Sequence, residues 1–250
     1  MSEAQKVIIG GISGGVGSAL AKRLHVSGWQ IAGFARNEHE LVKLREALPG
    51  VETAVCDATD AAAVGDVMPK LIESIGGVDA YVHAIGSIFI KPAHLTKDED
   101  WAATLNTNLN SGFYALRAVL GPMQKQQRGS CLFFSTAAAQ VGIANHEAIA
   151  AAKGGIEAMV RSAAATYASR GIRVNAIAPS LTETPLSRPL IGSEQGLEIS
   201  KKMHPLGQIG QPEDVASLAE WLVSGSAGFV TGQTFVMDGG VSTIVPKPRI

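Results

Sequence analysis

The chain is poor in cysteine and in net charge. Its 250 residues include only Cys56 and Cys131, and 21 Lys and Arg residues nearly balance 22 Asp and Glu residues, which leaves a formal net charge of −1. Both cysteines lie in apolar runs typical of buried strands, so we expect free thiols in a reduced cytosol rather than a disulfide. The small net charge gives no electrostatic basis for binding nucleic acid or an anionic membrane surface.

Long apolar runs are also absent. No stretch free of charges is long enough to span a bilayer, and residues 1–5 are polar and too short for the apolar part of a signal peptide. These absences predict a cytoplasmic protein without a membrane partner. The sequence does have 46% hydrophobic residues over its 250 positions, enough for the core of one large domain covering 1–250.

Short apolar segments alternate with segments of helical periodicity. We expect strands at residues 7–10, 30–35, 51–56, 80–84, 131–135, 173–177 and 235–237. Helices are expected at residues 18–26, 38–48, 61–75, within 101–123, at 146–169 and at 212–224. Strands this short, separated by helices, predict an α/β fold: a single-domain, Rossmann-like, doubly wound parallel sheet with helices on both faces. The tail, residues 245–250, is expected to be extended.

The turn between the first strand and the first helix is rich in glycine: residues 10–17 read GGISGGVG. Glycines let the backbone approach a pyrophosphate, and the following helix N-terminus offers unpaired N–H groups and the positive end of a dipole. A tight turn without a ligand would also explain the glycines, but the order of strand, turn and helix favours phosphate binding. The candidate cofactor-binding residues of this turn are Gly11, Ser13, Gly14, Gly15, Val16 and Gly17.

The spacing G-x-x-x-G-x-G in this turn resembles the short-chain dehydrogenase/reductase family, and further segments agree with it. His83-Ala84-Ile85-Gly86 takes the place of the family's Asn-Asn-Ala-Gly, and Asn108 matches its helix asparagine. Residues 172–179 and 231–240 are similar to its two C-terminal signatures. The likeness covers nearly the whole chain, and it implies cofactor contacts at Asp57, Ala58, Ala84, Gly86, Pro179, Thr182 and Thr184. It also implies a homotetramer or homodimer formed through the helices at 101–123 and 146–169.

The end of the second strand bears on the choice of cofactor. An acid there would bind the adenosine ribose hydroxyls and repel a 2′-phosphate, but the chain has Ala35 followed by Arg36. A guanidinium can stack on adenine and pair with that phosphate, so the sequence predicts NADP(H). The alternative is that Arg36 only solvates the strand end.

The catalytic residues depart from the family pattern. The family uses a serine, a tyrosine as proton donor and, four residues after the tyrosine, a lysine that also holds the ribose. By this resemblance Thr136 takes the place of the serine and Lys153 that of the lysine, but Ile149 stands in the tyrosine's position and cannot exchange a proton. The ordinary mechanism therefore requires a substitute acid.

His146 is the candidate substitute. It precedes Lys153 by seven residues, close to two helical turns, so both side chains could face one cleft, and an imidazole titrates near neutral pH. The same spacing occurs for a tyrosine in the divergent family branch that reduces enoyl thioesters, whose His-Ser-Ile-Gly segment resembles residues 83–86. Alternatively, His146 is only a helix N-cap with an exposed ring, His83 a hydrogen-bonded histidine at a strand end, and Asn108 structural rather than the holder of a water beside Lys153.

Residues 185–210 are rich in Pro, Gly and polar residues and follow a strand, so they are the candidate lid over a small-molecule substrate. The sequence thus predicts an NADP(H)-dependent reductase of a carbonyl or activated C=C bond, with no metal site. The alternative is an inactive NADP(H)-binding protein that acts as a sensor or oligomer partner. A purely structural subunit is disfavoured by the glycine turn and Lys153.

Overall fold

Seven parallel strands form one sheet in the computed structural model, which describes residues 4–245. The strands are β1 (Lys6–Gly10), β2 (Gln30–Ala35), β3 (Glu52–Val55), β4 (Ala80–His83), β5 (Gly129–Phe134), β6 (Ile172–Pro179) and β7 (Thr234–Met237). Their order in the sheet is β3-β2-β1-β4-β5-β6-β7, and every pairing is parallel. The predicted fold class is confirmed. The expectation for residues 246–250 lies outside the described part of the chain.

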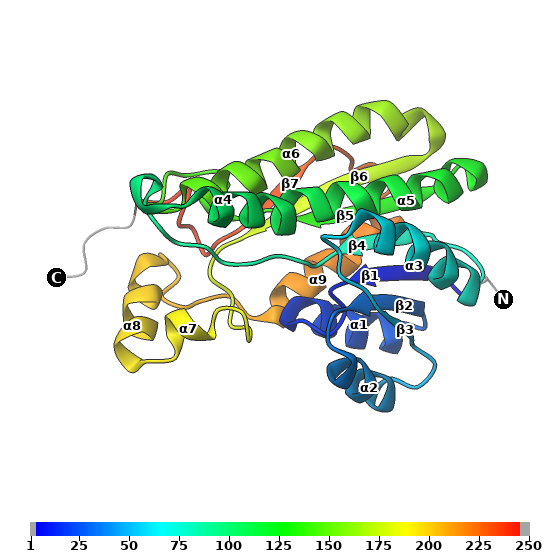
Figure 1. Ribbon diagram of the computed structural model, residues 1–250, viewed down its shortest axis with the longest axis horizontal. Helices are drawn as coiled ribbons and strands as arrows, with labels where there is room; N and C mark the ends of the chain where they lie inside the picture. The colour runs from blue at the N-terminus through cyan, green and yellow to red at the C-terminus, as the bar shows by residue number, and fades with distance from the viewer. Residues whose placement is uncertain (1–3, 246–250) are drawn as a thin grey trace.

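Helices cover both faces of the sheet (Figure 1). One face packs against α3 (Ala61–Ser74), α5 (Ser111–Gln126) and α6 (Glu147–Tyr167), and the other against α1 (Gly15–Val26), α2 (Glu38–Ala47) and α9 (Pro212–Val223). Successive strand residues point to opposite faces, so that Phe133 belongs to the first core and Leu132 to the second. The two layers fix the carboxyl ends of the strands along one edge of the molecule.

The long helix expected within 101–123 is interrupted. It begins earlier as α4 (Asp98–Leu105), changes to a π-helix over Asn106–Asn110, and continues as α5 to Gln126. A π-turn holds one extra residue per hydrogen-bonded ring and often marks a functional site. Here it carries Asn108, which is buried. The earlier start follows from three acids in the first turn of α4, which favour a helix N-terminus but give no apolar periodicity.

The candidate lid contains two helices that the sequence pattern did not predict, α7 (Arg188–Ile191) and α8 (Glu194–Met203). Ser193 caps α8 by accepting a hydrogen bond from the Gly196 N–H at 3.1 Å. Both helices lie beyond the sheet, apart from the two helical layers (Figure 1). The helix α1 also begins three residues before the expected position, because its first turn is the glycine-rich segment itself.

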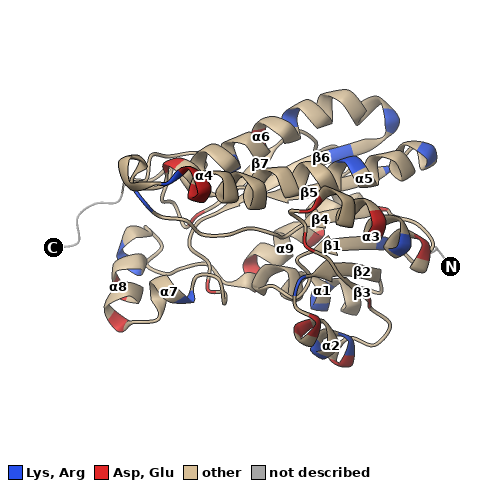
Figure 2. Cartoon of the chain, in the orientation of Figure 1, with Lys and Arg blue, Asp and Glu red and all other residues tan. Residues whose placement is uncertain are grey.

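Cys56 and Cys131 are both free and buried, as predicted. Lys, Arg, Asp and Glu residues are interspersed on α2 and α8, while α4 begins with acids alone (Figure 2). Over the described residues, the helices include none with the length and apolar character needed to cross a membrane.

Candidate functional site

A cavity of about 680 Å³ lies at the carboxyl ends of the strands. The chain leaves β1 toward β2 on one side and reaches β4 on the other, which is the switch point where open α/β sheets bind ligands. The volume falls within the range of about 300–1,000 Å³ typical of ligand sites. Every predicted site residue except Gly17 lines this cavity, so the fold brings together residues that are distant in the sequence.

The glycine turn forms one end of the cavity. Gly11 has a φ of +78°, a conformation suited to glycine, and a Cβ on Gly11 would lie 2.6 Å from the Ala84 carbonyl oxygen. A Cβ on Gly15 would lie 2.6 Å from Thr184 Cγ2 and would fill the gap between the turn and the loop after β6. Gly17 serves the turn rather than the cavity, since its Cβ would lie 2.2 Å from the Gly11 oxygen. The helix α1 starts here without a side-chain cap, so its first N–H groups remain open to an anion.

The ends of β2 and β3 lie beside this turn. Asp57 accepts hydrogen bonds from the Thr59 N–H at 2.9 Å and the Thr59 hydroxyl at 2.8 Å. These bonds lower the pKa of the Asp57 carboxyl, burial opposes them, and the charge of Arg36 lowers it further. Arg36 itself is exposed and, within residues 4–245, makes no ion pair or hydrogen bond. Its guanidinium is thus available to a ligand at the rim of the cavity.

Lys153 and Asn108 meet in the interior of the cavity. Lys153 Nζ donates to the Phe134 carbonyl oxygen at 2.9 Å, and burial lowers the pKa of the lysine from 10.5 to about 8. Asn108 Oδ1 accepts from the Ser87 N–H at 2.9 Å, and its amide donates to the Ser87 hydroxyl and the Thr104 carbonyl. A Cβ at residue 86 would lie 3.0 Å from Asn108 Oδ1 and 3.4 Å from Lys153 Nζ, so Gly86 keeps space open beside both polar groups.

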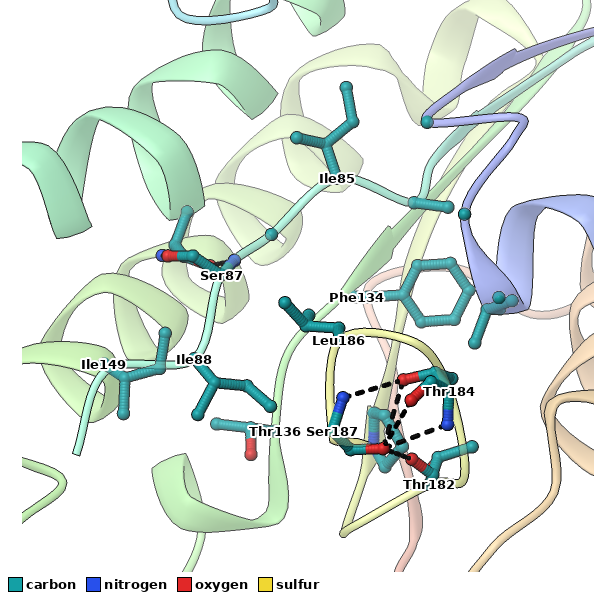
Figure 3. A pocket seen from close by; sticks show the side chains of 18 of the residues that line it. Ile85, Ser87, Ile88, Phe134, Thr136, Ile149, Thr182, Thr184, Leu186 and Ser187 are labelled. Atoms are coloured by element: carbon teal, nitrogen blue, oxygen red, sulfur yellow. Dashed lines mark hydrogen bonds between the residues drawn. The ribbon is translucent and has the colours of Figure 1, made fainter. Parts of the chain in front are cut away.

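Thr136 follows β5 and caps the short helix 137–139 through a 3.3 Å bond from the Ala138 N–H to Thr136 Oγ1. The threonine hydroxyl accepts in this bond and can still donate into the cavity. The neighbouring Ser135 hydroxyl is occupied, because it donates at 2.5 Å to the buried Glu157 carboxyl. Around the cavity stand the apolar side chains of Ile88, Ile149 and Leu186 (Figure 3).

His146 lines the cavity as the residue that caps α6, but its ring makes no capping bond. Its Nδ1 lies 2.8 Å from the Ala144 carbonyl oxygen, which can only accept, so Nδ1 carries a hydrogen. His83 is a different case. It is buried outside the cavity lining, bonded to the Tyr81 hydroxyl at 2.7 Å and the Ser111 hydroxyl at 2.9 Å. Burial lowers its pKa to about 3, helped by the charge of Lys153, so this ring is neutral and structural.

The end of β6 and the loop after it form another wall of the cavity. Pro179, Thr182 and Thr184, for which the family resemblance implies cofactor contacts, line the cavity. The loop is held by Ser187, whose hydroxyl donates to the Thr182 carbonyl at 2.6 Å and accepts from the Thr184 N–H at 2.9 Å (Figure 3). Ser187 carried no signal in the sequence, because it lies in a stretch that resembles any polar loop.

Ser180 and His204 form a pair that the sequence pattern did not predict. Both line the cavity, and His204 Nε2 lies 2.8 Å from Ser180 Oγ. Among the described residues no group of three or more His, Cys, Asp or Glu side chains could hold a metal ion.

Comparison with known proteins agrees with this geometry. A family model described as "Enoyl-(Acyl carrier protein) reductase" matches residues 11–242. The chain is 34% identical over 243 residues to the 3-oxoacyl-[acyl-carrier-protein] reductase FabG of Thermotoga maritima, covering 96% of this chain and 98% of that protein. It is 34% identical over 192 residues to inactive 2-(S)-hydroxypropyl-CoM dehydrogenase 2 of Xanthobacter autotrophicus, covering 75% of this chain and 84% of that protein.

Among solved structures, a variant of the actinorhodin polyketide ketoreductase with NADPH superimposes with a TM-score of 0.91 at 25% identity, covering 98% of this chain and 100% of that one. The fold and the site define a dinucleotide-binding α/β oxidoreductase. More specifically, the chain belongs to the short-chain dehydrogenase/reductase family, as its family model and its relatives over nearly its full length show.

Proposed function

We propose that the protein is an NADP(H)-dependent reductase of a carbonyl group or an activated C=C bond. One observation carries this proposal: Lys153, Thr136 and the glycine turn all line the same cavity. The glycine turn can hold a pyrophosphate, and the two polar groups lie where a substrate oxygen would need stabilisation.

The residues present fit the cofactor NADP(H). The open space at Gly11 and Gly15, with the free N–H groups of α1, suits the pyrophosphate, and the unpaired guanidinium of Arg36 suits a 2′-phosphate. The ketoreductase relative solved with NADPH supports the same choice. When bound, NADPH would supply a hydride.

The chain's own residues would handle the oxygen and the proton. Thr136 can donate its hydroxyl hydrogen to a developing alkoxide or enolate oxygen, and the Lys153 ammonium adds positive charge in an apolar environment where electrostatic stabilisation is strong. With a pKa of about 8, Lys153 is mostly protonated at neutral pH and close to the range in which a group can give up a proton. His146, with its Nδ1 hydrogen directed at Ala144, presents its other nitrogen for proton exchange.

Both kinds of double bond have support. The relative from Thermotoga maritima is named for the reduction of a 3-oxoacyl group, and the matching family model for the reduction of an enoyl group. The cavity walls formed by Ile88, Ile149 and Leu186 suit an apolar chain next to the reacting group. We propose a thioester-linked acyl group as the substrate class to test first.

Several finer features are part of this proposal. Residues 185–210, with α7 and α8, would act as the substrate lid of a single domain covering 1–250. Pairing of two or four copies through α5 and α6 would cover Phe113, which is 48% exposed on α5. The cytoplasm is the proposed location.

A second candidate function is cofactor binding without chemistry. By resemblance Ile149 stands where the family has its acid tyrosine, and a relative with 34% identity is itself named inactive. The protein would then act as an NADP(H) sensor or as a partner in an oligomer.

The test measures NADPH consumption, monitored as the loss of nicotinamide absorbance. The trial substrates are acetoacetyl-coenzyme A, crotonyl-coenzyme A and 9,10-phenanthrenequinone. Wild type is compared with His146→Ala and Ile149→Tyr, and NADPH affinity is measured for each. Turnover by wild type supports the reductase, and its loss in His146→Ala would assign the acid to that histidine. Tight NADPH binding without turnover, together with activity gained in Ile149→Tyr, would favour the inactive alternative.

A further inference from the structure

Ser180 and His204 form a hydrogen-bonded pair in the wall of the cavity. Ser180 directly follows β6, and His204 directly follows α8, so the bond joins the edge of the sheet to the candidate lid. His204 is only 6% exposed, although imidazole is polar, and each ring nitrogen has a partner. Neither side chain is used by the function proposed above.

The hydrogen-bond partners fix one proton of His204 and leave the other free to change. Its Nδ1 lies 2.7 Å from the Ser200 carbonyl oxygen, so Nδ1 carries a hydrogen in both protonation states. In the neutral ring, Nε2 therefore accepts the hydroxyl hydrogen of Ser180. In the imidazolium, Nε2 instead donates to Ser180 Oγ at 2.8 Å, and the serine hydroxyl hydrogen is released toward the cavity. The protonation state of His204 thus decides whether Ser180 can donate to a ligand.

Ser180 lines the same cavity as Thr136 and Lys153, and the two hydroxyl residues follow neighbouring strands. Phe134 on β5 pairs with Ile177 on β6, and the Ser135 N–H donates to the Ile177 oxygen at 2.7 Å. Thr136 comes two residues after Phe134, and Ser180 comes three residues after Ile177. The two residues therefore follow the ends of neighbouring strands. The Ser180 N–H donates to the Met237 oxygen of β7 at 3.0 Å, which holds its backbone in place.

A carboxylate interacts electrostatically with His204. Asp238 follows β7, where its side chain accepts hydrogen bonds from the Gly240 N–H at 2.8 Å and the Ser242 N–H at 2.7 Å. Burial raises the pKa of Asp238, but these bonds and the attraction of His204 lower it by more, so Asp238 is ionised.

We propose that Ser180 and His204 form a proton relay to the substrate oxygen, with Ser180 as the catalytic donor and His204 as the residue behind it. This inference rests on the proposed reductase function. As a carbonyl carbon accepts hydride, the π pair moves to the oxygen, and the Ser180 O–H bond breaks to protonate it. The Nε2 proton of His204 moves to Ser180 Oγ, which restores the serine. The neutral His204 then takes a proton from solvent, and the net reaction consumes one hydride and one proton.

The experiment measures kcat, KM and the NADPH dissociation constant for wild type, Ser180→Ala, Ser180→Thr and His204→Gln. The relay predicts that Ser180→Ala and His204→Gln lower kcat by about 100-fold or more, as expected for loss of a general acid, while KM and NADPH affinity change little. Ser180→Thr keeps a hydroxyl and should recover most of kcat. His25→Gln, at an exposed histidine of α1, is the matched control and should behave as wild type.

A second readout does not depend on turnover. In ¹⁵N NMR of the histidine rings, the His204 signals, assigned by their loss in His204→Gln, should show a protonated Nδ1, and Ser180→Ala should shift the Nε2 signal. A pair that is only structural would weaken KM or NADPH affinity together with kcat, and would not be rescued by threonine. Such a joint loss without rescue by threonine would overturn the relay. An unchanged kcat in Ser180→Ala or His204→Gln, or an Nε2 signal unaffected by Ser180→Ala, would overturn it as well. A wild type that binds NADPH but reduces none of the three probes would overturn the proposed function as well, whereas an active wild type with active variants rejects the relay alone.

Discussion

Replacing Lys153 by methionine tests the energetic cost of the buried ammonium. Lys153 is 7% exposed, and burial is the cause of its lowered pKa, from 10.5 to about 8. Between pH 8 and pH 10.5, the Lys153 side chain is therefore protonated in the unfolded chain and deprotonated in the folded chain. Stability rises with pH wherever the unfolded state binds more protons, so this lysine should make the free energy of unfolding increase over that interval.

The size of the effect follows from the two pKa values. Their difference, at roughly 1.36 kcal/mol for each pKa unit, amounts to about 3 kcal/mol. Below pH 8 both states are protonated, and the folded state carries the full cost of the buried charge. Lys153→Met removes this cost. Its stability relative to wild type should therefore be highest near neutral pH and should decline by about 3 kcal/mol as the pH rises to about 10.5.

The assay is urea unfolding followed by circular dichroism at a series of pH values from about 7 to about 10.5, on wild type, Lys153→Met and Lys22→Met. Lys22 is an exposed lysine of α1 and serves as the control for general alkaline effects. Loss of the bond to Phe134 shifts the variant by a constant amount and leaves the slope unchanged. A difference between Lys153→Met and wild type that is flat across this pH range would refute the assignment of a buried, destabilised ammonium.

Three further predictions concern the cofactor turn and the core. Arg36→Glu should weaken NADPH binding and strengthen NADH binding, since a carboxylate repels a 2′-phosphate; an unchanged ratio of the two dissociation constants, measured by fluorescence, would contradict this. Gly15→Ala should weaken NADPH binding about tenfold or more, because the added Cβ would lie 2.6 Å from Thr184 Cγ2. The control Gly65→Ala, whose Cβ would have nothing within 4 Å, should leave NADPH binding unchanged. Gly65→Ala should also stabilise α3 by about 0.5–1 kcal/mol, measured by thermal unfolding. Burial lowers the pKa of His83 from 6.5 to about 3, so at moderately low pH this side chain takes up a proton only when the chain unfolds. Between pH 6.5 and about pH 5, the free energy of unfolding should therefore fall by about 2 kcal/mol more in wild type than in His83→Asn, measured by urea unfolding.

The strands could be predicted because their signal is local. The expected strand at 30–35 coincides with β2, where four consecutive buried residues follow Gln30. The signal of the glycine turn is equally local, because the φ of +78° at Gly11 favours glycine whatever the rest of the chain contains. Expectations of this kind need no knowledge of what the rest of the chain does.

Other features depend on tertiary contacts and were missed. The π-turn at Asn106–Asn110 differs from α-helix by a shift of the hydrogen-bond register, and bonds from Asn108 to Ser87 hold its side chain in place. The helix α8 was not predicted because most of its residues are polar or glycine, and its apolar residues Ile199 and Met203 are more than half exposed. The Ser180–His204 bond spans 24 residues and joins two elements whose docking the sequence pattern does not encode.

Ile149 affects the surroundings of Lys153 as well as the proposed replacement of the proton donor. It is 7% exposed and lines the cavity, where it contributes an apolar wall rather than a group that could carry negative charge. Within the described chain Lys153 has no ion pair, and burial alone sets its pKa near 8; an anionic neighbour would raise that pKa. The proposed relay would supply a proton from a different element, because the bond from His204 to Ser180 joins the end of α8 to the end of β6 and not to α6.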